Sequence, residues 1–203
     1  MAGDERVGTA ALIQQAAVEV LLEVGLKAAT TRAVTTRVGV GRGLLNHYYR
    51  WPELRATAWA EIFAQVSAHQ FPSDVPPDQT LERYLSTGFR AEARAYWRLW
   101  IEATELAELD PVMSAHLRQV NLAMIGAMRS CLKAGAEKGL WLVEDAAGAA
   151  LRISALYDGL AGMLLAGTLD LTLAEAEAHL RRAVSLEVRR AEKVVADVGP
   201  AVG

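Results

Sequence analysis

The spacing of apolar residues constrains this chain more than any other feature of its sequence. Between residues 6 and 24, Ile13, Ala17, Val20 and Val24 follow one another at intervals of four, three and four. Such intervals place the side chains on one face of an α-helix. The sequence shows no convincing alternation of apolar and polar residues of the kind that indicates a half-buried strand. It therefore predicts an all-α protein, built from about nine helices.

Glycine, proline and capping residues set the expected ends of these helices. Three prolines lie within residues 72–79 and exclude a continuous helix there, because proline has no backbone N–H to donate. Thr172 and Glu175 fit a capping box, which marks the start of a last helix. We expect helices over residues 6–24, 31–38, 42–49, 52–69, 80–109, 112–138, 145–165 and 172–195.

Composition excludes several classes of protein. Of the 203 residues, 52% are apolar and 22% charged, so the chain can bury a core and is not a disordered polyelectrolyte. A single cysteine, Cys131, excludes a disulfide framework; we interpret it as a small buried hydrophobe, with a redox sensor as the alternative. The histidines show no metal-ligand spacing, so we expect no metal and no cofactor.

Targeting and membrane segments are not expected. The N-terminus lacks the apolar region of a signal peptide. The most apolar run, residues 153–169, is interrupted by Asp158 and by glycines, which argues against a membrane span. We therefore expect a cytoplasmic protein.

A basic segment lies near the N-terminus of a chain whose formal net charge is −3. Residues 25–55 contain six cationic side chains and one acid, Glu53, so this segment carries +5 and the rest of the chain −8. Such a segment is suited to face phosphates, although a merely solvated basic surface is the alternative. The six cations are Lys27, Arg32, Arg37, Arg42, Arg50 and Arg55.

Residues 30–50 carry the pattern of a helix-turn-helix. Two short predicted helices are joined by a turn at Gly39 and Val40. In such a unit the second helix enters the major groove of DNA with its N-terminal residues against the bases. Arg42 lies at that N-terminus, and its guanidinium can read guanine O6 and N7. Asn46, His47 and Tyr48 follow, and Arg32 and Arg50 flank the unit.

These residues resemble the DNA-binding domain of the TetR family of bacterial transcriptional regulators. The resemblance runs from Arg6 to about Leu54 and depends on Gly25, Thr30, Thr31, Val34, Gly39, Val40, Arg42, Gly43, Leu45, His47, Tyr48 and Tyr49, followed by Glu53 and Leu54. It implies that DNA is contacted by Thr31, Arg32, Arg42, Gly43, Leu44, Asn46, His47 and Tyr48, to which we add Arg50. The sequence departs from the family at Gly41, Asn46 and Pro52, where a Ser or Thr, a Tyr and a Lys are usual.

The remainder of the chain is similar to the family's regulatory domain. Residues 155–160 resemble part of the next-to-last helix in the glycine-betaine-pathway repressor branch. The resemblance implies a DNA-binding domain over residues 1–52 and a ligand-binding and dimerisation domain over residues 53–203. It also implies a homodimer in which the last two helices pair with their copies.

An aromatic stripe with nearby carboxylates suggests an effector pocket in the second domain. Aromatic rings and carboxylates together can enclose a cationic ligand. The alternative is ordinary core packing, which the same spacing also produces. The candidate ligand-binding residues are Phe89, Trp97, Trp100, Glu105, Asn121, Met124, Met128 and Tyr157.

Together these features predict a homodimeric, ligand-responsive repressor that binds a near-palindromic DNA operator and is released by a small-molecule effector. One alternative is a helical interaction or ligand-binding module without sequence-specific DNA binding. An all-helical enzyme is a further alternative, but no nucleophile–base pair or metal set is visible. Gly39, Gly41 and Gly43 do not form a nucleotide loop, because the third glycine comes one place early and no strand precedes them.

Overall fold

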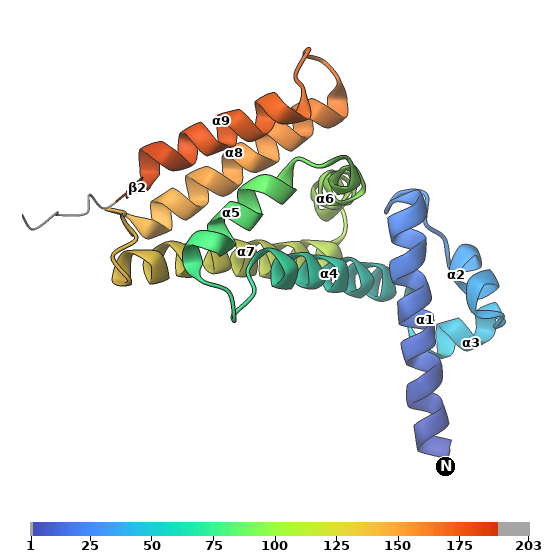
Figure 1. The fold of residues 1–203 in the computed structure, drawn as a ribbon. Coiled ribbons are helices and arrows are strands. Elements are labelled where there is room, and N and C mark those ends of the chain that lie inside the picture. The colour runs from blue at the N-terminus through green and yellow to red at the C-terminus, as the bar shows by residue number, and fades with distance from the viewer. Residues whose placement is uncertain (1, 191–203) are drawn as a thin grey trace, which may run out of the picture.

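The computed structural model describes residues 2–190, and in that range the fold is all-α apart from one short two-stranded ribbon (Figure 1). The elements are α1 (Ala2–Val24), α2 (Thr31–Val38), α3 (Arg42–Tyr48), α4 (Trp51–Gln70), α5 (Pro77–Gly88), the 3₁₀-helix η1 (Ala91–Ala93), α6 (Arg94–Ala107), α7 (Pro111–Glu137), β1 (Trp141–Leu142), α8 (Ala146–Ala166), α9 (Leu173–Glu187) and β2 (Arg189–Arg190). The expected all-α fold class is confirmed.

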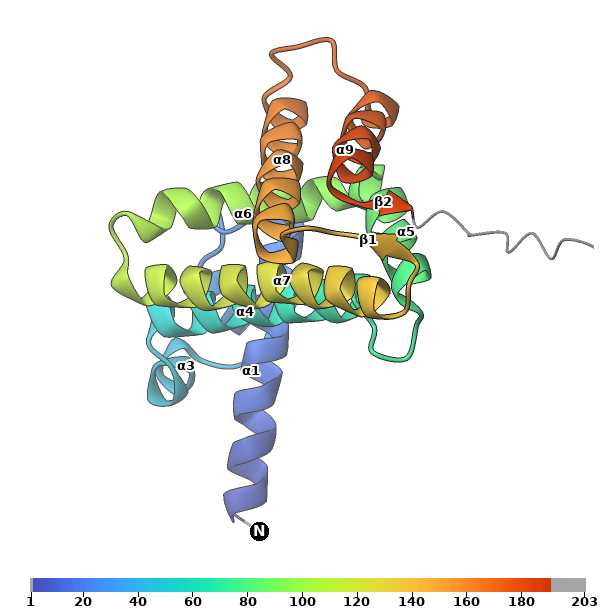
Figure 2. The ribbon, with the colours of Figure 1, turned by 90° about the vertical axis from the view of Figure 1, so that its left-hand side faces the viewer.

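The helices are arranged along one direction, with α1, α2 and α3 at one end and α8 and α9 at the other (Figure 1). Helix α4 leads from the first group into the body of the molecule, which is the part formed by α4 to α9. There it packs against α7. A second view shows α8 and α9 lying side by side on the face of the body opposite α4 (Figure 2).

Two hydrophobic clusters hold these helices together. The first joins α1, α2 and α3 to α4 and α6 through fully buried residues such as Ile13, Leu45 and Trp59. The second joins α5, α7, α8 and α9 around residues such as Leu132 and Leu180. Because the first cluster includes residues on both sides of residue 52, the N-terminal helices share a core with the start of the body.

The expected helix over residues 80–109 is wrong, because the chain breaks into α5, η1 and α6 at residues 89–93. Phe89 leaves the helical conformation and packs between the rings of Trp97 and Tyr157. Tyr157 donates a hydrogen bond to the carbonyl of Gly88, and a Cβ on Gly88 would lie 2.8 Å from the Tyr157 ring. Contacts between distant elements therefore override the helical periodicity of this segment.

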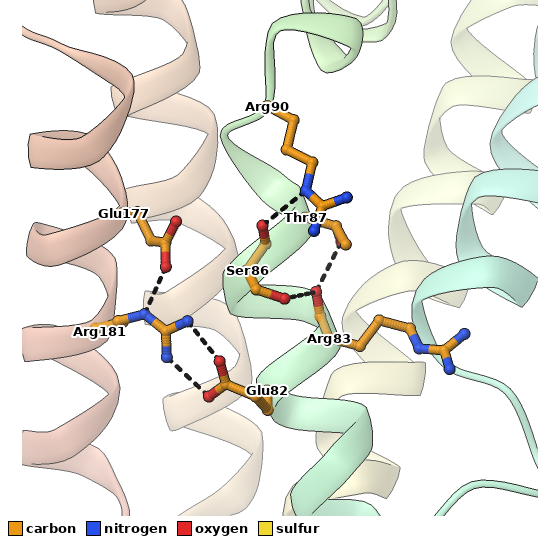
Figure 3. A network of polar contacts seen from close by, with 7 residues as sticks. All are labelled: Glu82, Arg83, Ser86, Thr87, Arg90, Glu177 and Arg181. Atoms are coloured by element: carbon orange, nitrogen blue, oxygen red, sulfur yellow. Dashed lines mark hydrogen bonds and ion pairs between the residues drawn. The ribbon is translucent and has the colours of Figure 1, made fainter.

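Two side chains near the end of α5 donate hydrogen bonds to its backbone carbonyls (Figure 3). The hydroxyl of Thr87 donates to the carbonyl of Arg83 at 2.7 Å, and Nε of Arg90 donates to the carbonyl of Ser86 at 3.1 Å. Ser86 lies in the last turn of α5, where carbonyls lack intrahelical partners, so Arg90 satisfies one of these carbonyls.

An ion-pair network ties α5 to α9 (Figure 3). The guanidinium of Arg181 donates two hydrogen bonds to the carboxylate of Glu82, at 2.8 and 2.6 Å, and Nε of Arg181 donates to Glu177 at 2.7 Å. The two-pronged geometry fixes the orientation of the pair as well as its distance. It orients α9 relative to the body.

The last predicted helix is also longer than the observed one. Helix α9 ends at Glu187, and Arg189 and Arg190 form a strand that pairs with Leu142 and Trp141. Residues 191–195, which were expected to continue the helix, lie outside the described residues. The expected start is confirmed, because Thr172 and Glu175 form the predicted capping box.

Most of the remaining helix boundaries agree closely with expectation. Helix α1 ends at Val24 as expected but begins at Ala2, four residues before the expected start. The helices expected over residues 31–38, 42–49, 52–69, 112–138 and 145–165 match α2, α3, α4, α7 and α8 to within one residue at each end. Capping explains several of these starts: Asp110 accepts hydrogen bonds from the backbone of Val112 and Met113, and Asp145 from the first turn of α8.

Helix α8 has an open apolar face. Among the described helices it alone is long and apolar enough to span a membrane, by length and composition. Leu151 and Met163 are 56% and 45% exposed on it, and Leu186 of α9 is 63% exposed. An apolar surface of this kind indicates that something covers it.

Candidate functional site

Helices α2 and α3 form a helix-turn-helix. Thr30 caps α2 by accepting a hydrogen bond from the backbone N–H of Ala33, and Gly39 closes it with a positive φ of 74°. Val34 of α2 and Leu45 of α3 are fully buried beneath the turn. These two anchors fix α3 against the rest of the N-terminal helices and leave its other face outward.

The outward face of α3 carries most of the predicted DNA-contacting residues. Arg42, Gly43, Leu44, Asn46 and His47 are exposed there. Arg32 and Arg50 are exposed on either side, whereas Thr31 and Tyr48 are half-buried. The structure thus brings all nine predicted residues to one end of the molecule, on and beside α3.

Ion pairs divide the cations of the basic segment into two groups. Lys27 pairs with Glu105 at 2.5 Å, Arg55 pairs with Asp110 at 2.8 Å, and Arg37 pairs with Glu19 and Glu23. Hydrogen bonding to Arg37 lowers the pKa of Glu23.

The other three cations are Arg32, Arg42 and Arg50. Within residues 2–190 none of the three has an ion-pair partner. The positive charge available to a phosphate backbone is therefore concentrated next to α3 rather than spread over the segment.

The start of α3 lacks a side-chain cap. Gly41 occupies the N-cap position with no side-chain hydrogen bond, and a Cβ on either Gly41 or Gly43 would meet no heavy atom within 4 Å. The N–H groups of the first turn are consequently accessible from outside, where they can face a phosphate.

The body holds an inner cavity of about 60 Å³ among α4, α5, α6, α7 and α8. Its lining residues are Phe63, Val66, Gln70, Phe71, Tyr84, Tyr96, Trp97, Trp100, Ile101, Asn121, Met124, Ile125, Met128, Ser154, Tyr157, Asp158 and Ala161. The set combines aromatic and aliphatic walls with a few polar groups, which is typical of a small-molecule site.

Aromatic rings form much of this wall. The ring centroids of Phe63 and Trp100 lie 5.1 Å apart, and those of Tyr84 and Tyr157 lie 5.7 Å apart. The indole N–H of Trp97 donates to the hydroxyl of Tyr157 at 2.9 Å, which fixes both rings. Burial raises the pKa of Tyr157 to about 12, so this hydroxyl stays protonated. The faces of such rings attract cations.

Asp158 of α8 supplies the charge in the inner cavity. It is the sole acidic residue among the lining residues of the described chain, and no Lys, Arg or His lines the cavity with it. Although the residue as a whole is exposed in the single chain, desolvation of its carboxyl by the groups packed around it raises the pKa to about 6. A cation inside the cavity would offset that cost.

Six of the eight predicted ligand-binding residues line the inner cavity: Trp97, Trp100, Asn121, Met124, Met128 and Tyr157. The structure places the other two elsewhere. Phe89 packs behind the wall against Trp97 and Tyr157. Glu105 points from α6 toward the N-terminal helices, because it pairs there with Lys27.

Sequence reasoning missed several lining residues, including Gln70, Tyr84, Tyr96 and Asp158. Of these, Asp158 offered a signal, because it is an acid in an otherwise apolar stretch and within the segment singled out for its family resemblance. Gln70 and Tyr84 offered none, since their positions depend on how α4 and α5 pack.

A second space, here called the outer groove, adjoins the inner cavity and has a volume of about 380 Å³. It lies between α1, α4 and the connection from α5 to α6, and it shares four residues with the inner cavity: Val66, Gln70, Tyr96 and Tyr157. Its own lining is more polar and includes Gln65, His69, Thr87, Arg90 and Glu92.

Helix α6 connects the inner cavity to the N-terminal helices. One face carries Trp97 and Trp100 into the cavity wall. From another face, the carboxylate of Glu102 accepts hydrogen bonds from the backbone N–H groups of Leu26, at 2.5 Å, and Lys27, at 3.3 Å. These groups follow Gly25, whose φ of 87° ends α1. A shift of α6 therefore acts directly on the end of α1.

Two other predictions concern cysteine and metal chemistry. Cys131 is buried, and desolvation raises its pKa to about 11, which keeps the thiol protonated and unreactive. This favours the interpretation as a buried hydrophobe over a redox sensor. Within residues 2–190, no group of three or more His, Cys, Asp or Glu side chains is placed to hold a metal ion.

Family models match both parts of the chain. Residues 13–50 match the model described as bacterial regulatory proteins, tetR family, and residues 77–189 match the model described as BetI-type transcriptional repressor, C-terminal. A search of the curated proteins returned no match.

Solved structures share the fold. A putative TetR-family transcriptional regulator from Rhodococcus sp. has a TM-score of 0.73 at 21% identity, with 91% of this chain and 98% of that chain covered. A putative transcriptional regulator from Saccharomonospora viridis, solved in complex with choline, has a TM-score of 0.73 at 15% identity, with 90% and 98% covered. A putative transcriptional regulator from Pseudomonas aeruginosa PAO1 has a TM-score of 0.67 at 23% identity, with 88% and 89% covered.

Proposed function

Because the chain belongs to the TetR family of bacterial transcriptional regulators, with a BetI-type C-terminal domain, we propose that it is a homodimeric repressor released from its operator by a small organic cation. Residues 1–52 serve as the DNA-binding domain and residues 53–203 as the ligand-binding and dimerisation domain. Two copies of α3 occupy successive major grooves of a near-palindromic operator.

The observation that carries this proposal is the double role of α6. The same helix supplies Trp97 and Trp100 to the inner cavity and Glu102 to the end of α1. A ligand that binds better to one position of α6 than to another changes the population of DNA-competent dimers. This arrangement connects the inner cavity to the end of α1 through a single helix.

A cationic effector is supported by the charge and walls of the inner cavity. Asp158 lines it without any cationic side chain, and aromatic faces surround the space. Cation–aromatic attraction strengthens when water is excluded. The neighbour from Saccharomonospora viridis was solved in complex with choline, a quaternary ammonium ion of this chemical class.

A homodimer is supported by the open apolar face of α8 and α9. Leu151, Met163 and Leu186 are exposed in the single chain, and a twofold pairing of these helices buries them. A membrane is the less favoured occupant, because the exposed Arg152 interrupts the apolar surface of α8. We place the dimer in the cytoplasm, where operator DNA is found.

The alternative is a ligand-binding module that does not recognise a DNA sequence. It is favoured by Asn46 and Pro52, which replace residues usual in the family, and by the missing cap at Gly41. The exposed and unpaired Arg42 favours the repressor instead. Members of this family generally act by binding DNA rather than by catalysis, so an enzyme is not proposed.

A gel-shift experiment tests the proposal with the full-length protein and the DNA upstream of its own gene. We expect a specific complex that weakens between about 50 and 200 mM salt, because phosphate contacts release counterions. Choline, added as a probe cation, should dissociate it. Equal affinity for the upstream DNA and for scrambled DNA contradicts the repressor, whereas a specific complex that no ammonium ion dissociates contradicts only the proposed effector.

A further inference from the structure

Gln70 contains a buried polar atom that no residue of the described chain satisfies. The residue is 7% exposed at the end of α4, and its side-chain oxygen Oε1 has no hydrogen-bond partner within residues 2–190. A buried acceptor without a donor costs free energy, so such atoms are rare in native proteins and indicate a partner that is bound at times.

Gln70 lies where the inner cavity and the outer groove meet, because it lines both. Two of the donors that line the outer groove are already used. The hydroxyl of Thr87 donates to the carbonyl of Arg83, and the hydroxyl of Tyr157 donates to the carbonyl of Gly88. A molecule in the cavity can supply the donor that Gln70 lacks.

The two acceptors of this region face different parts of the space. Asp158 lines the inner cavity alone, among the aromatic walls, whereas Gln70 also borders the outer groove. A ligand that satisfies both has a cationic head in the inner cavity and an O–H or N–H group directed toward the groove. The groove, at about 380 Å³, has room for the substituent that carries this donor.

We propose that Gln70 determines effector specificity by accepting a hydrogen bond from a hydroxyl or amine group on an ammonium ligand, so that ammonium ions bearing a donor bind in preference to those without one. The inference rests on the cationic effector proposed above. It adds a selection among cations that charge and aromatic walls alone do not provide, because those attract any ammonium ion of suitable size.

Calorimetric titration with three ammonium ions tests the inference. Choline carries a hydroxyl, its O-methyl ether has the same charge but no donor, and tetramethylammonium is the cation alone. We expect the full-length protein to bind choline about three- to tenfold more tightly than the ether, the range of one neutral hydrogen bond to a buried acceptor. Gln70→Met, which retains the volume and removes the acceptor, should reduce this ratio to about one.

Matched variants separate specificity from folding. Gln119→Met changes an exposed glutamine of α7 that lines neither the inner cavity nor the outer groove, and it should leave the choline-to-ether ratio unchanged. Gln70→Glu retains an acceptor oxygen and should preserve the preference for choline. Thermal unfolding of each variant verifies that the fold is intact.

Each outcome has a defined meaning. Equal binding of choline and its ether by the wild-type protein overturns the role of Gln70, and so does a preference that persists in Gln70→Met. If both bind equally and Asp158→Asn weakens both, the cation site stands and only the inference fails. If none of the three ions binds, the cationic effector fails and the inference fails with it.

Discussion

The arginines of the basic segment differ in whether they have ion-pair partners. Arg37 and Arg55 are held by acids, whereas Arg42 and Arg50 have no ion-pair partner within residues 2–190 and lie beside or on α3. In the proposed DNA complex, Arg42 at the N-terminus of α3 reads base edges and Arg50 after α3 contacts the backbone. The two arginines should therefore behave differently when removed.

Arg42→Ala should lose sequence discrimination worth roughly 1–3 kcal/mol, because a two-pronged contact to guanine is lost. Arg50→Ala should weaken binding to every DNA sequence by a similar factor and reduce the salt dependence. Competition gel shifts with operator and random DNA measure both effects. Equal losses on the two DNAs after Arg42→Ala contradict its assignment to base reading.

Asp158 should make effector binding depend on pH. Its pKa of about 6 lies above the ordinary value of an aspartate because of burial, so the carboxylate becomes protonated when the pH falls through 6. Only the ionised form attracts a cation. The affinity for tetramethylammonium should therefore fall roughly tenfold between pH 7.5 and pH 5.

The same shift has the opposite sign for stability without ligand. A carboxyl group whose pKa is raised in the folded state destabilises the fold as the pH rises from about 4 through 6, because ionisation is easier in the unfolded chain. Asp158→Asn should remove the pH dependence of cation binding, with the neutral-pH affinity lowered. A binding profile that remains steep in this variant assigns the titration to another group.

The sequence predicted the positions of some residues of the two candidate sites but not of others. The exposed face of α3 followed from the spacing of Val34, Gly39 and Leu45, because local pattern fixes a helix-turn-helix. Trp97 and Trp100 in the cavity wall belong to the aromatic stripe of the sequence. Gln70 and Tyr84 were not predicted, since they come from separate helices that only tertiary packing brings together.

Helices as elements were predicted where local signals agreed with packing. Pro52, Gly139 and the capping residues placed α4, α7 and α8 to within one residue. The prediction of one helix over residues 80–109 was wrong because the periodicity of this segment is helical throughout. The break at Phe89 is imposed by Tyr157, a residue far away in the sequence. Similarly, α9 ends where backbone pairing with β1 begins.

Helix α6 should transmit effector binding through Glu102. Glu102→Ala removes the acceptor for the N–H groups of Leu26 and Lys27, at a cost of roughly 1–3 kcal/mol to that contact. We expect cation affinity to change little and the cation concentration needed to dissociate DNA to rise several-fold. Calorimetry and gel shifts on the same preparation measure the two quantities.

Glu105→Ala is the matched control for Glu102→Ala. It removes a carboxylate from the same helix, but Glu105 forms an exposed ion pair with Lys27, and such pairs contribute little. Its response to cation should resemble that of the wild-type protein. If the cation concentration needed to dissociate DNA rises equally in both variants, the cause is a general charge effect and not transmission through the end of α1.

At the scale of the whole molecule, the proposed dimer depends on the open face of α8 and α9. Leu151→Glu places a charge at the centre of an exposed apolar surface and should convert a dimer into a monomer, with operator binding lost because one α3 cannot fill two half-sites. Sedimentation velocity gives the mass directly. Leu109→Glu changes a leucine that is 89% exposed outside α8 and α9, and it should remain dimeric.

Helix α4 is a continuous rod of 20 residues, about 30 Å long, that begins beside α3 and ends at Gln70 on the cavity wall. In a rigid rod, a tilt of about 5° at one end displaces the other end by roughly 2.5 Å. That displacement is comparable to a hydrogen-bond length, so it suffices to take a side chain out of register with a base edge. A ligand barely larger than a few water molecules can in this way alter a contact with DNA that it never approaches.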